Sequence, residues 1–362
     1  MLLKKLFLAF IIIFLLGLEI LIKSGNISPV LFQLLFNKNI ELKKSSPDRI
    51  NFLLLGIGGG KHEGPNLSDT IIFASLDTKK AKVTLVSLPR DMWSYDIDGK
   101  INTAYAKGQS KKKGGGLTLA KSVVGRITGQ NIDYGLVIDF SGFVRAVDLM
   151  GGLDINVDKT FDYYEYPIEG KEDDPCGNKE EDLDKLATAS SQLGVFPCRY
   201  EHLHFDKGLN HMDGNTALKF VRSRHAKGSE GTDFARSQRQ EKIIKAFMDK
   251  AFSLQILVNP AKVIGLYDTI RDSVDTDIQQ NEFDDFIKLA EKFRNAKIQS
   301  VVLDYGDSKT ERGGLLTHPP ISRDYNYEWT LIPRTGNKEY SEIQEYIKCS
   351  LTNDNCIISP IP

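Results

Sequence analysis

The chain has 362 residues, of which 41% are hydrophobic and 26% charged, and its formal net charge is −1 at pH 7. This is an ordinary globular composition, long enough for one large domain or two modest ones. The charge gives no indication of a nucleic-acid partner, and no spaced pattern of basic and aromatic residues supports one.

The N-terminus is predicted to be a membrane anchor. Residues 6–22 are almost wholly apolar and follow Lys4 and Lys5. The length of this run lies at the short end of the range for a membrane-spanning helix. A cleaved signal peptide is the alternative, but no small-x-small cleavage motif follows the run. We therefore favour an uncleaved single-pass helix over residues 1–23 in the cell membrane. The positive-inside rule places its N-terminus in the cytoplasm and the rest of the chain outside.

The four cysteines suit an extracytoplasmic location. Cys176 and Cys198 flank a polar insertion, and Cys349 and Cys356 lie seven residues apart near the C-terminus. Two local disulfides are the simplest pairing, although three connectivities are possible. No Cys-x-x-Cys spacing occurs and the histidines lie elsewhere in the sequence, so a zinc site is not expected.

The folded domain is predicted to begin after a juxtamembrane linker, residues 24–48. Residues 49–56 form a continuous apolar run, which is typical of a strand buried on both faces. The glycine-rich segment 56–60 follows. It lacks the Gly-x-Gly-x-x-Gly spacing of a phosphate-binding loop, so a plain flexible loop is the better interpretation.

The next two strands, 71–76 and 83–88, are predicted to form a hairpin. Asp69 precedes the first strand, and Arg90 and Asp91 follow the second. Antiparallel pairing brings these ends together. Two carboxylates and an arginine at one sheet edge suit a magnesium or proton-transfer site, and a turn aspartate with a salt bridge is the alternative.

The middle of the chain alternates helical and strand patterns, which favours an α/β layered fold. Residues 100–113 are basic and read as a mobile lip or a solvated loop. Residues 163–201 form a long acidic insertion with few strand or helix signals. The remaining predicted elements are helices 116–127 and 140–150 and strands 134–139 and 153–157.

Two predicted helices carry a concentration of arginine. Asp213 is the expected N-cap of the first, which ends in Arg222 and Arg224. Asp233 is the expected N-cap of the second, whose buried stripe comprises Ile243, Phe247, Ala251 and Leu254.

The first turns of the second helix carry Arg236, Arg239 and Gln240, which share one face. Arginines near a helix N-terminus are unfavourable unless an anion is present, so a phosphate or pyrophosphate pocket is one interpretation. A solvated basic face partnered by Asp233 and Glu241 is the other.

Beyond this region, residues 260–274 and 281–293 are predicted helices, and 299–303 is a predicted strand that could join the sheet. The tail, residues 311–362, contains a predicted helix at 340–348. We interpret it as the closing segment of the same domain, which begins at residue 49 and has its main body at 49–310.

Several short motifs occur in an order that is jointly very specific between residues 51 and 254. They are Ser68-Asp69-Thr70, Ser87-Leu88-Pro89-Arg90-Asp91, Lys100-Ile101-Asn102-Thr103-Ala104-Tyr105, Met212-Asp213-Gly214-Asn215-Thr216-Ala217-Leu218, Arg222-Ser223-Arg224-His225 and Asp233-Phe234-Ala235-Arg236-Ser237-Gln238-Arg239-Gln240. Together they resemble the LytR-CpsA-Psr family.

The resemblance implies a membrane-anchored phosphotransferase of the bacterial cell envelope. Such enzymes move a glycopolymer from a polyprenyl-pyrophosphate carrier to peptidoglycan with the help of Mg²⁺. The implied fold is a three-layer α-β-α sandwich with a central mixed sheet and a groove for the lipid tail. Carried over by motif, the pyrophosphate-binding residues are Arg90, Arg222, Arg224, Arg239, Gln240 and Arg236. Asp69 and Asp91 match the carboxylates near the metal and the acceptor hydroxyl, with Arg90 beside them as a catalytic residue.

Two positions depart from the family pattern. Gly58 stands where many members have a metal-binding aspartate, and Leu67 stands where many have an arginine. His62, Glu63 or glycine amides could compensate; otherwise dependence on Mg²⁺ is weakened. Two alternative functions therefore stay open, a polyprenyl-pyrophosphate hydrolase and a non-catalytic protein that binds the lipid carrier.

Overall fold

The computed structural model describes residues 40–59, 64–168, 170–179, 191–223, 226, 228–251, 253, 256, 259–293, 296–306 and 313–358. The predicted anchor and most of the linker lie outside these ranges. Within them, no helix has the length and apolar character needed to cross a membrane.

The described chain is built on a six-stranded sheet with the strand order β11-β6-β1-β2-β3-β12. β1 is antiparallel to β2 and parallel to β6, and β12 is parallel to β3, so the sheet is mixed as predicted. The strands are β1 (Arg49–Ile57), β2 (Ser68–Asp77), β3 (Lys82–Ser87), β6 (Tyr134–Asp139), β11 (Val274–Thr276) and β12 (Lys297–Val302). The strand expected at 299–303 is confirmed as the edge strand β12.

β1 is buried on both faces because it lies in the middle of the sheet. Leu53 and Leu55 belong to one core cluster, and Phe52 belongs to another on the opposite face. Successive side chains of a strand point to opposite faces. The continuous apolar run of β1 therefore serves two cores, which makes three layers.

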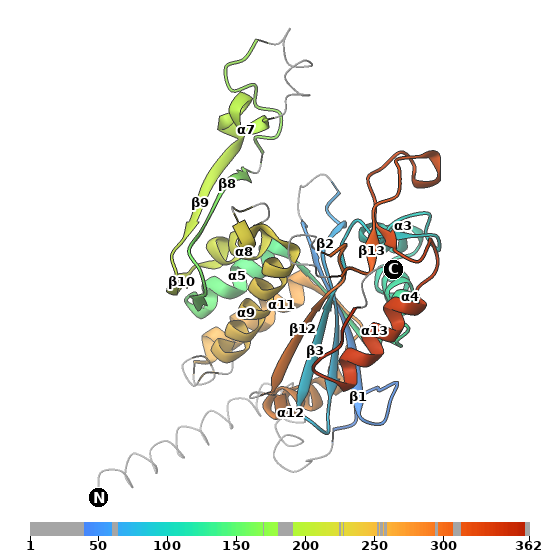
Figure 1. Cartoon of the computed structure of the whole chain (residues 1–362). Helices are drawn as coiled ribbons and strands as arrows, with labels where there is room; N and C mark the ends of the chain where they lie inside the picture. Colours follow the sequence, from blue (N-terminus) through green and yellow to red (C-terminus); the bar gives the residue numbers. More distant parts are fainter. Residues whose placement is uncertain are drawn as a thin grey trace, which may run out of the picture.

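Helices cover both faces of the sheet (Figure 1). On one side lie α3 (Ala104–Lys111), α4 (Gly115–Thr128) and α13 (Ser341–Thr352). On the other lie α5 (Phe140–Met150), α8 (Gly214–Arg222), α9 (Asp233–Ala251), α11 (Pro260–Ser273) and α12 (Phe283–Phe293). The α/β prediction is confirmed, and β6 and α5 have the predicted bounds.

The prediction of a loop at residues 100–113 is wrong. The chain there forms β5 (Gly99–Lys100), a 3₁₀ turn (Ile101–Thr103) and α3. A Cβ on Gly108 would lie only 2.5 Å from the carbonyl oxygen of Gly115. The absence of a side chain at Gly108 therefore allows α3 to pack closely against α4.

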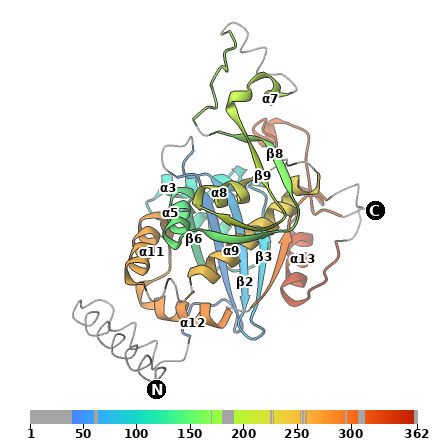
Figure 2. The same cartoon turned by 90° about the vertical axis from the view of Figure 1, so that its left-hand side faces the viewer.

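The acidic insertion contains an extended hairpin. The prediction that this segment has little regular structure is therefore wrong. β8 (Phe161–Pro167) pairs with β9 (Tyr200–Phe205), and a short helix α7 (Gln192–Val195) lies toward the far end. Both views show this arm projecting from the helices at its base (Figures 1 and 2). A disulfide between Cys176 and Cys198 staples it. Below it, β7 (Leu153–Val157) pairs with β10 (Gly208–Met212).

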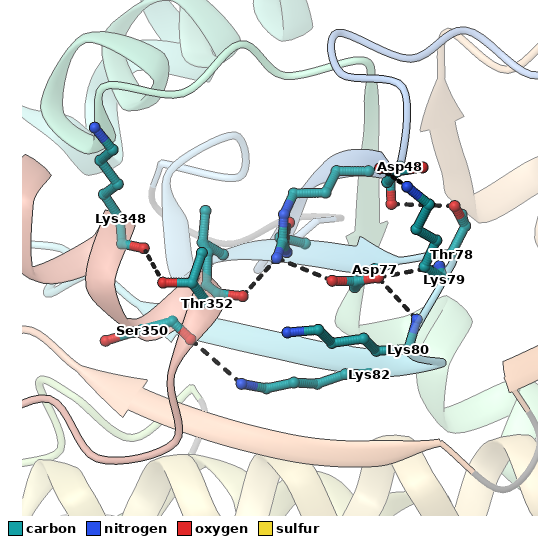
Figure 3. Close-up of polar contacts among 12 residues, drawn as sticks. Asp48, Asp77, Thr78, Lys79, Lys80, Lys82, Lys348, Ser350 and Thr352 are labelled. Carbon is teal, nitrogen blue, oxygen red and sulfur yellow. Dashed lines mark hydrogen bonds and ion pairs between the residues drawn. The ribbon is translucent and has the colours of Figure 1, made fainter.

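The C-terminal helix is fastened to the ends of β1, β2 and β3 that lie opposite Asp69. Arg49 donates to Asp77 Oδ2 at 3.1 Å and to the Leu351 carbonyl. Lys82 Nζ lies 3.5 Å from the Ser350 carbonyl (Figure 3). The predicted disulfide between Cys349 and Cys356 is also present. Ile343 and Ile347 of α13 are fully buried in the same core as β1.

Candidate functional site

A cluster of charged side chains gathers where β2 begins and β3 ends, and we call it the rim cluster: Asp69, Arg90, Asp91, Lys100 and Arg222. The antiparallel pairing of β2 with β3 places Asp69 and Asp91 on the same guanidinium group. Arg90 Nη1 lies 2.5 Å from Asp69 Oδ1, and Arg90 Nε lies 3.6 Å from Asp91 Oδ2. The prediction that the hairpin brings Asp69, Arg90 and Asp91 together is therefore confirmed.

Arg222 reaches the rim cluster from the end of α8. Asp213 is the predicted N-cap of this helix and accepts from the Thr216 amide at 2.7 Å, which lowers the pKa of its carboxyl. Arg222 is the last residue of α8, where a cation interacts favourably with the helix dipole. Its Nη2 lies 3.6 Å from Asp69 Oδ2, and its guanidinium lies 4.8 Å from the Phe140 ring centroid. Two arginines from different elements thus meet at one carboxylate.

Asp91 has a different set of neighbours. Its Oδ1 lies 3.4 Å from Lys100 Nζ, which also contacts Glu328 at 3.0 Å. The Asp91 carbonyl accepts from the Thr330 hydroxyl at 2.8 Å and from the Leu331 amide at 3.0 Å. The C-terminal segment therefore holds the backbone of Asp91, and Lys100 orients its carboxylate.

The environment of Arg239 differs from that of the rim cluster. Arg239 is buried, with only 3% of it exposed. Its guanidinium donates to the carbonyls of Phe220, Ser223 and Glu230 at 3.0, 2.7 and 2.9 Å, and it also contacts the Glu230 carboxylate at 3.3 Å. Burial lowers the pKa of Arg239 to about 10, although Glu230 opposes the shift. All three nitrogens are engaged within the protein, so Arg239 ties α9 to the end of α8.

A sequence signal for the buried position of Arg239 was available. It precedes Ile243 by four residues and therefore extends the row of Ile243, Phe247 and Ala251, of which Ile243 is buried and the other two are partly buried. Arg236 and Gln240 form a separate row four residues apart on α9, and both are half-buried. Arg224 and His225 lie outside the described residues.

The beginning of α9 differs by one residue from the prediction. The Thr232 hydroxyl accepts from the Ala235 amide at 3.1 Å, so Thr232 is the N-cap and Asp233 is the first helical residue. Glu241, the alternative partner for the arginines, accepts a hydrogen bond from Ser300 of β12 instead. Leu254, the last member of the predicted stripe, lies outside the described residues.

The structure adds a carboxylate that the sequence analysis missed. Ile57 at the end of β1 pairs with Ser68 on one side and with Asp139 on the other. Asp69 and Asp139 therefore flank the place where the chain reaches Gly58. A Cβ on Gly59 would lie 2.8 Å from Asp139 Cβ, so Asp139 abuts this loop. Its Oδ1 caps α5 by accepting from the Gly142 amide at 2.5 Å.

The other positions proposed to compensate for Gly58, His62 and Glu63, lie outside the described residues. Leu67 is half-buried next to the tight turn in which its amide donates to the Gly64 carbonyl at 2.9 Å. The charge carried by an arginine at that position in many family members is therefore absent here. Within the described chain, Arg90 and Arg222 supply the guanidinium groups at this rim.

The sequence and fold together define the class of protein. The family model described as the LytR_cpsA_psr family matches residues 32–315. This chain belongs to the LytR-CpsA-Psr family.

Named relatives are moderately similar to the chain. A polyisoprenyl-teichoic acid–peptidoglycan teichoic acid transferase, TagU of Bacillus cereus, is 27% identical over 252 residues, which are 68% of this chain and 66% of that protein. TagV of Bacillus subtilis, with the same activity in its name, is 26% identical over 75% of this chain and 60% of its own length. The chain thus spans slightly less than two thirds of the length of these relatives.

Solved structures share the fold. The Lin1025 protein of Listeria innocua has a TM-score of 0.54 at 22% identity, covering 85% of this chain and all of that one (100%). A structure of TagT bound to LIIa-WTA has a TM-score of 0.52 at 19% identity, covering 88% of this chain and 96% of that chain. At these identities the likeness concerns the fold alone.

Proposed function

We propose that this protein is a membrane-anchored phosphotransferase that moves a glycopolymer from a polyprenyl-pyrophosphate carrier to peptidoglycan. The observation that carries the proposal is the meeting of Arg90 and Arg222 at Asp69. Their side chains remain 37% and 33% exposed, so a ligand can reach both. The relatives TagU and TagV, which are named for transfer of teichoic acid to peptidoglycan, support the same reaction class.

The pyrophosphate is assigned to the arginines whose hydrogen bonds can be exchanged. Arg90 and Arg222 contact only carboxylates and an aromatic ring in the contacts described above, and their planar forks can turn to phosphate oxygens. Arg224, two residues beyond Arg222, is included on the resemblance. On α9 we assign this role to Arg236 and Gln240. Arg239 is left out because binding a ligand would break its three backbone hydrogen bonds.

The carboxylates of this edge fit a magnesium ion, since Mg²⁺ takes oxygen ligands. Asp69 and Asp139 flank the end of β1 at Gly58, where many family members carry an aspartate. We propose that Asp69 and Asp139 hold the ion, with Asp139 compensating for Gly58 from the neighbouring strand. Asp91, which the sequence analysis also predicted as a metal ligand, is not assigned to the ion in this proposal. When bound, the ion would neutralise charge on the phosphoryl oxygens.

The protein residues then divide the reaction between them. Arg90 and Arg222 hold the pyrophosphate and stabilise the charge that develops on its oxygens. The acceptor hydroxyl attacks the phosphorus that carries the glycopolymer, and the bridging P–O bond breaks to release polyprenyl phosphate. Asp91 takes the hydroxyl proton as general base, because it lies at the edge of the rim cluster away from Arg222.

The acceptor is expected to approach along the C-terminal segment that holds Asp91. Trp329 is 45% exposed and stacks on His318 with ring centroids 5.1 Å apart, one residue before Thr330. Such an aromatic face suits a sugar ring of the acceptor.

The replacement Trp329→Ala should raise the acceptor concentration at half-maximal rate and leave carrier binding unchanged. An equal loss of carrier binding would remove Trp329 from the acceptor side.

The location is part of the proposal. The apolar run at 6–22 would anchor the chain in the cell membrane, with the folded part outside, where a membrane-held lipid carrier and peptidoglycan are both accessible. The two disulfides support an oxidising compartment. A single-cysteine tag fused to the C-terminus, probed with a membrane-impermeant thiol reagent in intact cells, should react; protection would reverse the orientation.

The experiment that tests the function uses the full chain in detergent. It is incubated with a polyprenyl-pyrophosphate-linked oligosaccharide and peptidoglycan fragments, with and without Mg²⁺. We expect oligosaccharide joined to the fragments, and we expect Arg90→Ala and Arg222→Ala to abolish it. Arg126→Ala is the matched control, since Arg126 also forms an exposed ion pair, with Asp96 at 2.7 Å, on the opposite side of the sheet.

Two other outcomes would replace the proposal. Release of phosphate without joining, in the presence of competent acceptor fragments, would make the protein a hydrolase. Tight carrier binding with no turnover under any metal condition would make it a non-catalytic carrier-binding protein. Activity that is insensitive to both arginine replacements would reject the assigned site but leave the reaction class in place.

A further inference from the structure

A group of imidazole and carboxylate side chains lies on the hairpin arm, outside the rim cluster. Residues of β8 and β9 alternate between two faces. The inward face carries Phe161, Tyr163, Leu203 and Phe205, which are buried. The outward face carries Asp162, His202 and His204, of which both histidines are exposed. The strand register places Asp162 directly opposite His204.

The three outward side chains converge on a small volume. Asp162 Oδ1 lies 2.7 Å from His202 Nε2 and 2.8 Å from His204 Nδ1. The nitrogen and oxygen atoms all lie within 4.8 Å of one another. One carboxylate oxygen therefore contacts two imidazole rings. A simple ion pair would involve only one of them.

From this geometry we propose that Asp162, His202 and His204 form a binding site for a divalent transition-metal ion of the Zn²⁺ type. Two imidazole nitrogens and one carboxylate oxygen are a common set for zinc with a fourth position open to water. Mg²⁺ does not suit this set because it prefers oxygen ligands. The site is therefore chemically distinct from the magnesium site proposed at the rim.

The surrounding residues orient the ligands. The other ring nitrogen of His204, Nε2, lies 3.3 Å from Asp206 Oδ1, so a carboxylate can accept its proton while Nδ1 faces the metal. Metal-bound histidines usually have such a partner. The His202 ring stacks on Tyr164 with centroids 4.1 Å apart and planes 1° apart, which fixes its orientation.

The ligand atoms would need a small rearrangement. Tetrahedral bonds of about 2.1 Å place ligand atoms about 3.4 Å apart, whereas the nitrogen–oxygen distances here are 2.7 and 2.8 Å. Rotation of exposed side chains can open the gap, since the strand backbones carry the ligands in fixed register. The bound ion would cross-link β8 to β9 nearer the body of the protein than the disulfide Cys176–Cys198, so the arm would be fastened at two levels.

The rest of the described chain offers a matched comparison. His211 of β10 is also exposed and lies 2.7 Å from a carboxylate, that of Asp154, but it has no second imidazole in that pairing. The other metal-type cluster among the described residues contains Asp174, Cys176 and Cys198. Its two sulfur atoms are joined in the disulfide and cannot act as thiolate ligands.

Metal titration of the full chain in detergent, without a histidine tag, tests the proposal. We expect Zn²⁺ to bind by calorimetry with one equivalent per chain, and we expect Co²⁺ to give the absorption of a low-coordinate nitrogen and oxygen site. A tenfold excess of Mg²⁺ should leave both signals unchanged. His202→Ala and His204→Ala should each remove the site, while His211→Ala should retain it.

Each contrary result has one meaning. Binding that is equal in His202→Ala, His204→Ala and the unchanged chain would overturn the proposal, as would binding that is lost in His211→Ala alone. Absence of Zn²⁺ binding to the unchanged chain would also overturn it. Circular dichroism of the variants and retention of their carrier binding verify that the fold survives, because these outward side chains do not form the core.

Discussion

Arg90 and Arg239 belong to the same predicted pyrophosphate cluster, but the structure places them in opposite environments. Arg90 is about one-third exposed and contacts the carboxylates of Asp69 and Asp91. Arg239 is buried, and its hydrogen bonds go mostly to backbone carbonyls. An arginine can serve a ligand only if its present partners can be given up, so the number of satisfied donors separates a binding arginine from a structural one.

The largest expected effect is on stability at Arg239. Arg239→Ala would leave three carbonyls and the half-buried Glu230 without their donor, so we expect the free energy of unfolding to fall by about 3 kcal/mol. Arg239→Lys should recover only part of this, because an ammonium group cannot reproduce the planar fork. Urea unfolding followed by circular dichroism measures both changes.

Arg126→Ala is the control for this prediction, since Arg126 is exposed and its ion pair should contribute less than about 1 kcal/mol. If Arg239→Ala unfolded no more readily than Arg126→Ala and instead lost pyrophosphate affinity, the comparison would be reversed. Arg239 would then be a ligand-binding residue.

The second effect concerns binding at the exposed arginines. Arg90→Ala and Arg222→Ala should each weaken the affinity for farnesyl pyrophosphate about ten- to hundredfold, because each removes charge-assisted hydrogen bonds. Their unfolding free energies should change by less than about 1 kcal/mol. Calorimetric titration beside urea unfolding separates the two quantities. Unchanged affinity in both variants would remove the rim cluster from consideration.

The third effect concerns the metal. Asp139→Asn keeps an N-cap of comparable strength for α5, but it removes a negative charge next to Gly59. We expect the Mg²⁺ concentration at half-maximal transfer to rise severalfold, with little change in stability. Gly58→Asp in the same background should restore it. A Mg²⁺ response equal to that of the unchanged protein would show that Asp139 only caps the helix.

The smallest effect is expected at an ion pair far from the rim cluster. Hydrogen bonds from Lys297 and Lys82 lower the pKa of Asp354 to about 2. The folded-state pKa lies below the ordinary value of 3.8, so the stabilisation is present above about pH 4 and is lost as the pH falls toward 2. Asp354→Asn should therefore be slightly less stable at neutral pH, and the difference should vanish in acid. A difference that persists at pH 2 would require another cause.

The hairpin of β2 and β3, the Asp213 cap of α8 and the strand–helix alternation were predictable because each depends on a local sequence pattern. Residues 100–113 were not, because their basic composition is also typical of a solvated loop, and the close packing of α3 on α4 at Gly108 is a tertiary contact. Asp139 was missed for a related reason. Its contact with Gly59 depends on the pairing of β6 with β1, which are separated by about eighty residues in the sequence. Arg239 was predictable in principle from the apolar row it extends.

The docking of α13 has a practical consequence for anyone who shortens this chain. The family match ends at residue 315, yet Ile343, Ile347 and Leu351 lie in the core that also contains Leu53 and Leu55. A truncation at the family boundary would remove α13 from the face that it shares with α3 and α4, and would expose apolar core residues to water. Such a fragment is expected to aggregate, so loss of its activity would say nothing about the role of the C-terminal residues in the reaction.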